Sequence, residues 1–213
     1  MPTTSPSRAE RAGLCDLLLA VGPDAPTLCA GWVTADLAAH LLVRERRPLA
    51  GPGLVLGGAA AALTARITAR AKAAHTYEDL VARVRRGPPP WTAPFDAVIN
   101  TVEYFVHHED VRRGGGDHRA RPESAQGELA DALWEALRRG AKLMTRPLGS
   151  AGLDLVRPEG GVLHARAGTP LVTLRGSPGE LALVLTGRGA AASVEPEGSP
   201  EALAALGSAR FGL

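Results

Sequence analysis

The clearest pattern of apolar and polar positions covers residues 95–113. At about 100° per residue, an apolar stripe forms one side of this segment; it contains Phe95, Val98, Ile99, Val102, Phe105 and Val106. A second, polar stripe runs beside it and contains Asp96, Asn100, Glu103, His107 and Asp110. The pattern predicts one helix with a buried apolar face and a neighbouring polar face.

Further helices are predicted from the same periodicity and from their end signals. They cover residues 7–21, 35–47, 59–74, 76–86 and 122–144, and glycine or proline follows most of them. In the helix at 35–47, Leu37, His40, Leu41 and Arg44 share one face. That face places a histidine in a stripe that is expected to point toward the core.

The pattern changes after Pro147. Short β-rich segments follow at 153–157, 162–167, 171–175 and 191–194, with helices expected at 179–185 and 200–206. We therefore expect a mainly α chain, with a helical domain in residues 1–147 and a small α+β C-terminal domain in residues 148–213; the family resemblance described below implies that the helical domain is a four-helix bundle.

Composition adds limits to this picture. The chain has 213 residues, 45% hydrophobic and 22% charged, which is typical of a globular protein. Its 24 basic and 22 acidic residues are mixed along the sequence, so no basic block indicates nucleic-acid binding. No segment approaches the ~20 apolar residues of a membrane span, and the first residues lack the apolar core of a signal peptide. The bias toward Ala, Gly, Arg and Pro suggests a GC-rich coding genome.

The two cysteines, Cys15 and Cys29, form no C-x-x-C motif and no disulfide framework, which fits a reducing cytoplasm. Cys15 is expected to be a small core residue of the first helix. Cys29 lies in the connector just before Trp32, from which it could approach a site, although we expect it to remain outside.

Glu103 and His107 are candidate metal ligands. Residues four apart on a helix have Cβ atoms about 5–6 Å apart, so a carboxylate and an imidazole can bind one ion. His40 would complete a set of three if its helix packs beside theirs, because bundles build metal sites from facing helices and catalytic zinc keeps an open fourth position. The alternatives without a metal are a solvent-exposed Glu103–His107 pair and a His40 that is only a core residue. His108, about 100° from His107, is the second choice as a ligand and is expected to be exposed.

Three further side chains are candidates for supporting roles. Asp36 and Asp110 each lie one helical turn from a proposed histidine ligand, so either carboxylate could orient an imidazole without binding the metal itself. Arg44 lies one turn beyond His40 and could face an anionic substrate.

Two segments carry a resemblance to a known family. In TLCAGWVTADLAAHLLVRER, which begins at Thr27, the pattern W-x-x-x-D-L-x-x-H occurs as Trp32, Asp36, Leu37 and His40, and NTVEYFVHHEDVRR carries E-x-x-x-H as Glu103 and His107. They resemble the metal-binding N-terminal domain of the mycothiol-dependent maleylpyruvate isomerase family, within the DinB-like four-helix bundles. The resemblance covers residues 8–113 well. It is weaker over residues 152–213, where the segment 176–188 is similar to the small C-terminal domain of the same family.

This resemblance implies a divalent metal, usually zinc, bound by His40, Glu103 and His107, with mycothiol as the thiol cosubstrate. The metal would activate the thiol for attack on a small-molecule electrophile, which leads to isomerisation or S-transfer. A metal-dependent hydrolase that activates water is the alternative enzyme. A non-catalytic module, with Asp110 or Cys29 closing the metal's ligand shell, is the alternative outside enzymes. A monomer or homodimer without nucleic-acid or membrane partners is expected.

Overall fold

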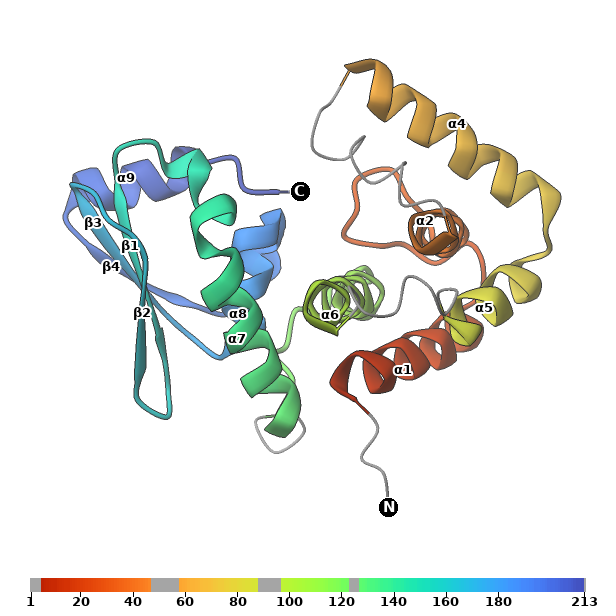
Figure 1. The fold of residues 1–213 in the computed structure, drawn as a ribbon, viewed down its shortest axis with the longest axis horizontal. Helices are drawn as coiled ribbons and strands as arrows, with labels where there is room; N and C mark the ends of the chain where they lie inside the picture. The colour runs from red at the N-terminus through yellow and green to blue at the C-terminus, as the bar shows by residue number, and fades with distance from the viewer. Residues whose placement is uncertain (1–4, 47–57, 88–96, 123–126, 213) are drawn as a thin grey trace. The chain divides into compact units, whose positions relative to one another are not determined.

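The computed structural model describes residues 5–46, 58–87, 97–122 and 127–212. The chain divides into two compact units, Met1–Asp117 and His118–Leu213 (Figure 1). Among the described helices, none has both the length and the apolar character needed to cross a bilayer. Each unit has its own buried apolar core.

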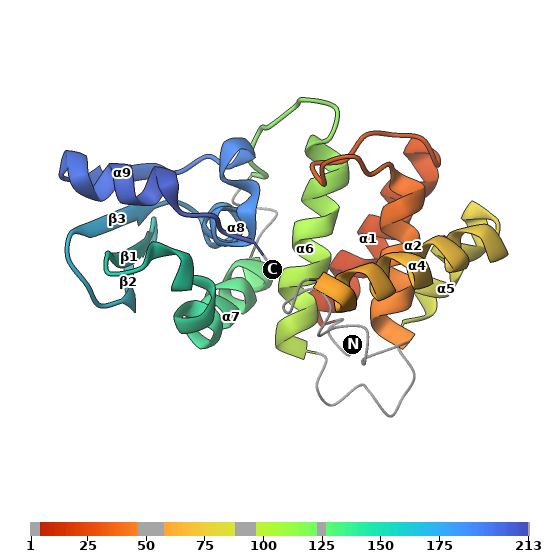
Figure 2. The ribbon, with the colours of Figure 1, turned by 90° about the horizontal axis from the view of Figure 1, so that it is seen from above.

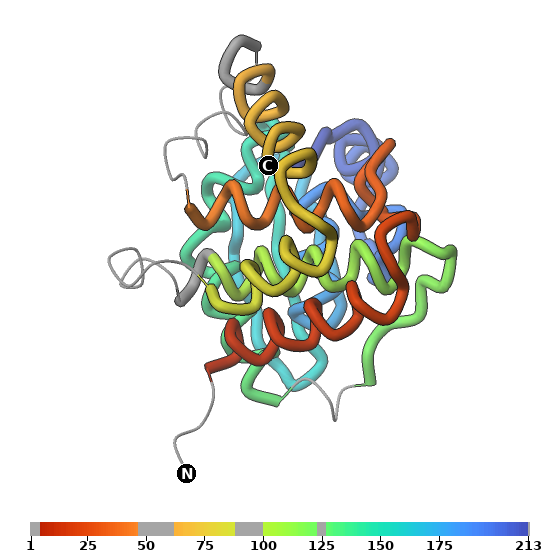
Figure 3. The backbone as a smooth tube through the Cα atoms, turned by 90° about the vertical axis from the view of Figure 1, so that its right-hand side faces the viewer, coloured from red at the N-terminus to blue at the C-terminus, as the bar shows by residue number. Residues whose placement is uncertain are grey.

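The first unit consists of helices. They are α1 (Pro6–Val21), α2 (Thr34–Arg46), α4 (Gly58–Ala74), α5 (Tyr77–Arg86) and α6 (Ala97–Arg113). Helices α1, α2 and α6 lie side by side with their axes roughly aligned in Figure 3, where α1 is red, α2 orange and α6 light green. The core joins α1, α2, α5 and α6 through side chains that include Leu14, Leu18, Leu37, Leu41, Leu80 and Tyr104.

Helix α6 is more deeply buried than the sequence pattern predicts. The residues from Asn100 to Arg113 are buried or half-buried, including those of the predicted polar stripe. Polar groups of α1 and α2 compensate the buried polar side chains: Tyr104 donates a hydrogen bond to Glu45, and His108 pairs with Glu10. The predicted positions Phe95 and Asp96 lie outside the described residues, as do the side chains of Val98 and Ile99.

The connector between α1 and α2 is attached to the C-terminal end of α6. The backbone N–H of Leu28 donates to the carbonyl of Asp110 at 3.0 Å. Gly114 permits this approach, because a Cβ atom at this position would lie 2.1 Å from the carbonyl oxygen of Pro26. A turn then follows, in which the Trp32 N–H donates to the Cys29 carbonyl. These contacts bring Cys29 and Trp32 close to α6.

The second unit is a four-stranded sheet with helices. Its strand order is β2-β1-β3-β4, with β1 parallel to β3 and antiparallel to β2, and β3 antiparallel to β4. The elements are α7 (Gly127–Met144), β1 (Gly152–Arg157), β2 (Gly161–Arg166), β3 (Leu171–Arg175), α8 (Pro178–Leu183), β4 (Glu195–Gly198) and α9 (Pro200–Ser208), with short helical turns at Arg146–Leu148, Val184–Arg188 and Gly189–Ala191. Figure 2 shows α7, α8 and α9 beside this sheet.

One face of the sheet is buried, because Leu153 and Leu155 of β1 alternate with more exposed neighbours, as do Val172 and Leu174 of β3. Leu137 of α7 belongs to the same core. Helix α7 therefore belongs to the second unit by its contacts, whereas the sequence places the boundary after it. The last strand also differs, since β4 occupies 195–198 and not 191–194. The predicted class, a mainly α chain with a small α+β portion at its C-terminal end, is confirmed.

Candidate metal centre

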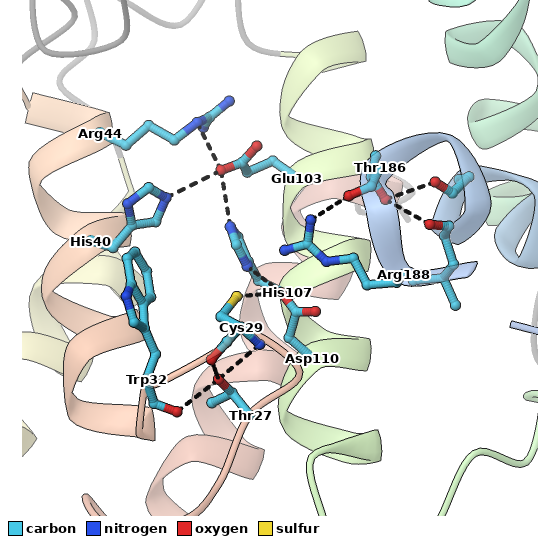
Figure 4. Close-up of polar contacts among 12 residues, drawn as sticks. Thr27, Cys29, Trp32, His40, Arg44, Glu103, His107, Asp110, Thr186 and Arg188 are labelled. Carbon is cyan, nitrogen blue, oxygen red and sulfur yellow. Dashed lines mark hydrogen bonds and ion pairs between the residues drawn. The ribbon is translucent and has the colours of Figure 1, made fainter. Parts of the chain in front are cut away.

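Helices α2 and α6 bring three of the candidate ligands together. His40 projects from α2, and Glu103 and His107 project from α6 (Figure 4). Where α1 and α6 approach along their backbones, α2 and α6 meet mainly through long side chains. The space between these two helices is thus occupied by polar groups.

The separations of the ligand atoms suit one metal ion. The Oε1 atom of Glu103 lies 3.1 Å from Nε2 of His107 and 3.7 Å from Nε2 of His40, and all three ligand atoms lie within 4.8 Å of one another. Ligands bound at about 2.0–2.1 Å in tetrahedral geometry lie about 3.3 Å apart. The donor set, two imidazoles and one carboxylate, is also one that zinc accepts. The residues therefore fit a divalent metal.

Asp110 orients the His107 ring. Its Oδ2 atom lies 2.8 Å from Nδ1 of His107, and the Asp110 side chain is fully buried. A proton on Nδ1 would be donated to this carboxylate, which leaves the Nε2 lone pair directed toward Glu103 and His40. This is the arrangement expected of a metal-binding histidine and its supporting carboxylate.

Asp36 has different partners from those that the sequence suggested. One carboxylate oxygen pairs with Nζ of Lys72 at 2.6 Å, and the other accepts the backbone N–H of Val33 at 3.2 Å. The second contact caps the start of α2. Asp36 therefore stabilises the helix that carries His40, and its two oxygens are directed at Lys72 and Val33.

The pKa values of His40 and His107 are shifted in opposite directions. Burial lowers the pKa of His40, and the nearby His107 acts in the same direction, so His40 is neutral near pH 7. Burial alone would also lower the pKa of His107, but hydrogen bonds with Asp110, Cys29 and Glu103 outweigh it and raise that pKa well above its usual range. The pKa of Glu103 is held well below its usual range because its contacts with His107, His40 and Arg44 outweigh burial.

Arg44 is directed at the same carboxylate. Its Nε atom lies 3.0 Å from Oε1 of Glu103, and Nη1 donates to Oδ1 of Asn100 at 2.7 Å. Without a metal, Glu103 is thus balanced by a guanidinium and a protonated imidazole. Arg44 thus contacts the proposed ligand Glu103, and Asn100 is the partner that fixes its guanidinium.

Cys29 lies closer to the site than expected. Its thiol donates to Oδ2 of Asp110 at 3.2 Å, so Cys29, Asp110 and His107 form a second group whose ligand atoms lie within 4.8 Å. This group gathers on the Nδ1 side of His107, whereas Glu103 and His40 face Nε2. The two ring nitrogens point in diverging directions, so Cys29 and Asp110 are poorly placed to close the shell of an ion on the Nε2 side.

Two contributions were missed in the sequence. The Trp32 ring lies 5.1 Å from the His40 ring, centroid to centroid, and limits its rotation. Thr27 accepts the N–H of Cys29 and donates to the carbonyl of Trp32, which holds the connector in place. Both residues stand in the connector that carries the family resemblance. Periodicity could not assign them to the site, because it cannot show that a connector folds back onto a distant helix.

His108 does not join the cluster. Its Nδ1 atom pairs with Glu10 of α1 at 3.0 Å, and its ring packs against Gly13, where a Cβ atom would lie 3.0 Å from Cε1. The expectation that His108 is exposed was wrong, because α1 covers this side of α6. His108 is therefore not placed to share a metal ion with His40 and Glu103.

Comparison with known proteins gives two solved structures. One is a mycothiol-dependent maleylpyruvate isomerase, with a TM-score of 0.57, 17% identity and 90% coverage of each chain. The other is a histidine-to-alanine mutant of the mycothiol-dependent maleylpyruvate isomerase, with a TM-score of 0.56, 16% identity and 90% coverage of each chain. No protein-family model and no curated protein sequence matches the chain. At this level of identity the likeness concerns the fold.

Proposed function

We propose that this protein is a divalent-metal-dependent isomerase or S-transferase that uses mycothiol as its cosubstrate, and that it is a distant member of the mycothiol-dependent maleylpyruvate isomerase family. The observation that carries the proposal is the convergence of His40, Glu103 and His107 from two helices, at separations suited to one ion. The full-length likeness in fold to a mycothiol-dependent isomerase supports it.

His40, Glu103 and His107 would hold the metal, for which we propose zinc. When bound, the metal would lower the pKa of a coordinated thiol, so that a thiolate nucleophile forms near neutral pH. Asp110 keeps the His107 ring in the orientation that presents Nε2, and Trp32 limits rotation of His40. Preorganised ligands of this kind lose little freedom on binding.

The charges of the cluster favour an anionic partner. In the metal-free site, the carboxylates of Glu103 and Asp110 balance Arg44 and a protonated His107. Replacing the His107 proton with a divalent cation leaves one surplus positive charge. A thiolate would neutralise it, and so would a carboxylate group of an electrophilic substrate held by Arg44.

The chain's own cysteines are poor candidates for the nucleophile. Burial raises the pKa of the Cys15 thiol to about 11, and this thiol packs against α5 in the core. The Cys29 thiol donates to Asp110, on the Nδ1 side of His107. An external low-molecular-weight thiol, kept reduced in a cytoplasm, is therefore the thiol we propose.

The test is a melting experiment with metal-loaded protein and mycothiol. A ligand that binds only the folded state stabilises it by about 2.7 kcal/mol at one hundred times its Kd, which raises the melting temperature measurably. We expect a rise with mycothiol, a much smaller rise with S-methyl mycothiol, and none with mycothiol in His107→Ala. The His108→Ala variant is the matched control and should respond as the parent does.

Equal shifts with mycothiol and its S-methyl form would show that the thiol does not reach the metal. No shift with either compound, in protein that retains its metal, would refute the mycothiol assignment. Hydrolytic activity on ester or amide substrates in such protein would then favour the hydrolase.

A further inference from the structure

A cavity of about 340 Å³ lies in the first unit, away from the metal-centre residues. Its lining comes from α2, α4 and the α5 region, which lie beside one another in Figure 1. The lining residues are Leu42, Val43, Arg46, Ile67, Arg70, Ala71, Ala74, His75 and Arg83. This volume is at the lower end of the range of about 300–1,000 Å³ that is typical of small-molecule sites.

The floor of the cavity is apolar. Leu42 and Val43 of α2 are almost fully buried, and Ile67 of α4 is half-buried. Ala71 and Ala74 contribute only methyl groups, so α4 leaves space where larger side chains would fill it. An apolar ligand body would be removed from water here, which favours binding.

The remaining lining residues are basic, and none of the described residues that line the cavity is acidic. Arg83 and His75 share the carboxylate of Asp79, at 2.9 and 3.0 Å. Among the described residues, no hydrogen bond or ion pair engages Arg46 or Arg70. Arg46 and Arg70 thus line a mainly apolar cavity, and arginine guanidinium groups bind carboxylates with paired hydrogen bonds.

Two of the three cavity residues on α2, Leu42 and Arg46, face away from the metal-centre residues. Leu42 follows His40 by two positions and Arg46 follows Arg44 by two, which turns each about 200° around the helix axis. A ligand in the cavity therefore has no need to touch the residues proposed to bind metal.

We propose that this cavity binds a small amphiphilic anion, a hydrocarbon chain that ends in a carboxylate. The chain packs on Leu42, Val43 and Ile67, and the carboxylate pairs with Arg46 and Arg70. This site is separate from the proposed thiol chemistry and does not depend on it.

The binding test uses octanoate with the full-length, metal-loaded protein in a calorimetric titration. Acetate carries only the head group and 1-octanol only the chain, so each should bind at least about tenfold more weakly than octanoate. Octyl phosphate distinguishes a carboxylate site from a general anion site. Octanoate binding no tighter than acetate or 1-octanol would overturn the proposal, and preference for octyl phosphate would overturn its choice of carboxylate.

Matched variants locate the site. Arg70→Ser should weaken octanoate binding about fivefold to tenfold, which is the size of one partly exposed charge-assisted contact. Arg66→Ser is the control, because Arg66 is exposed on the same helix one turn earlier and does not line the cavity. Ala71→Trp should block the cavity and abolish binding. Equal affinity in Arg66→Ser and Arg70→Ser, with binding retained in Ala71→Trp, would place the ligand elsewhere.

Discussion

At the scale of single residues, the chemistry of the centre depends on how His107 is held. Its ring is fixed between a buried carboxylate at Nδ1 and a second carboxylate at Nε2. The first contact sets the tautomer and the second defines where a cation would bind. Burial keeps His40 neutral, and the Trp32 ring packs against it.

Replacing Asp110 should weaken metal binding without removing a ligand. We expect Asp110→Asn to lower the affinity for zinc by about 10–100-fold, because the amide no longer enforces the Nδ1-protonated ring. Asp36→Asn is the control, since Asp36 contacts Lys72 and Val33 and leaves His40 untouched. Competition titrations with a chromophoric chelator give both affinities. Equal losses in the two variants would contradict the role of Asp110.

Metal binding should release protons in a predictable direction. The pKa of His107 lies well above its usual range in the metal-free fold, so this ring carries a proton at pH 7 that a metal must displace. His40 has a lowered pKa and has no proton to release. Zinc affinity should therefore rise with pH, with release of about one proton near pH 7.

Calorimetry in buffers of different ionisation enthalpy measures this proton count. In His107→Ala, any residual zinc binding should release far fewer protons. An affinity that stays constant from about pH 6 to pH 8 would be inconsistent with a protonated His107.

Cys15 makes stability depend on pH in the alkaline range. Burial raises its pKa from 9.0 to about 11, so the folded state holds this proton more tightly than the unfolded state. The contribution of Cys15 to the free energy of unfolding is fully present below pH 9. It falls by roughly 2 kcal/mol as the pH rises toward 11. Denaturant unfolding should show that Cys15→Ala loses this part of the decline and that Cys29→Ser keeps it. If the free energy of unfolding falls equally with pH above 9 in the parent and in Cys15→Ala, Cys15 is not the group responsible.

At the scale of elements, the contact between the connector and α6 brings Cys29 to Asp110. Gly114 is the residue that allows it, because the carbonyl of Pro26 occupies the space that a Cβ atom would need. Its neighbour Gly115 has nothing within 4 Å of such an atom. Neither glycine has a positive φ, so the two positions differ in space and not in backbone strain.

Gly114→Ala should therefore be destabilising, by about 1–3 kcal/mol in denaturant unfolding, because the connector must move away from α6. Gly115→Ala should change stability by less than about 0.5 kcal/mol. The displaced connector should also expose Cys29 to thiol reagents. If the two alanine variants are equally stable, the close approach does not exist in solution.

The sequence predicted these elements to different degrees. Helical periodicity was sufficient for α6, and the four-residue spacing was sufficient to pair Glu103 with His107. The contact of Asp36 with Lys72 joins residues 36 positions apart, and the hydrogen bond of Cys29 to Asp110 joins residues 81 positions apart. Contacts between such distant residues leave no local periodic signal. The apolar face of α7 was visible, but its packing partner in the second unit was not.

At the scale of the whole molecule, the proposed metal ligands all lie within the first unit, Met1–Asp117. The second unit has its own core, formed by the sheet with α7, α8 and α9. Leu42 and Arg46, which line the amphiphile cavity of the first unit, face away from the metal-centre residues on α2.

The central claim is tested most directly by metal analysis of purified, dialysed protein. The parent chain should carry about one divalent metal ion per molecule, as expected for one three-ligand site. His40→Ala and His107→Ala should lose it, and His108→Ala should retain it. A parent protein without stoichiometric metal, or histidine variants that bind it as well as the parent does, would contradict the account.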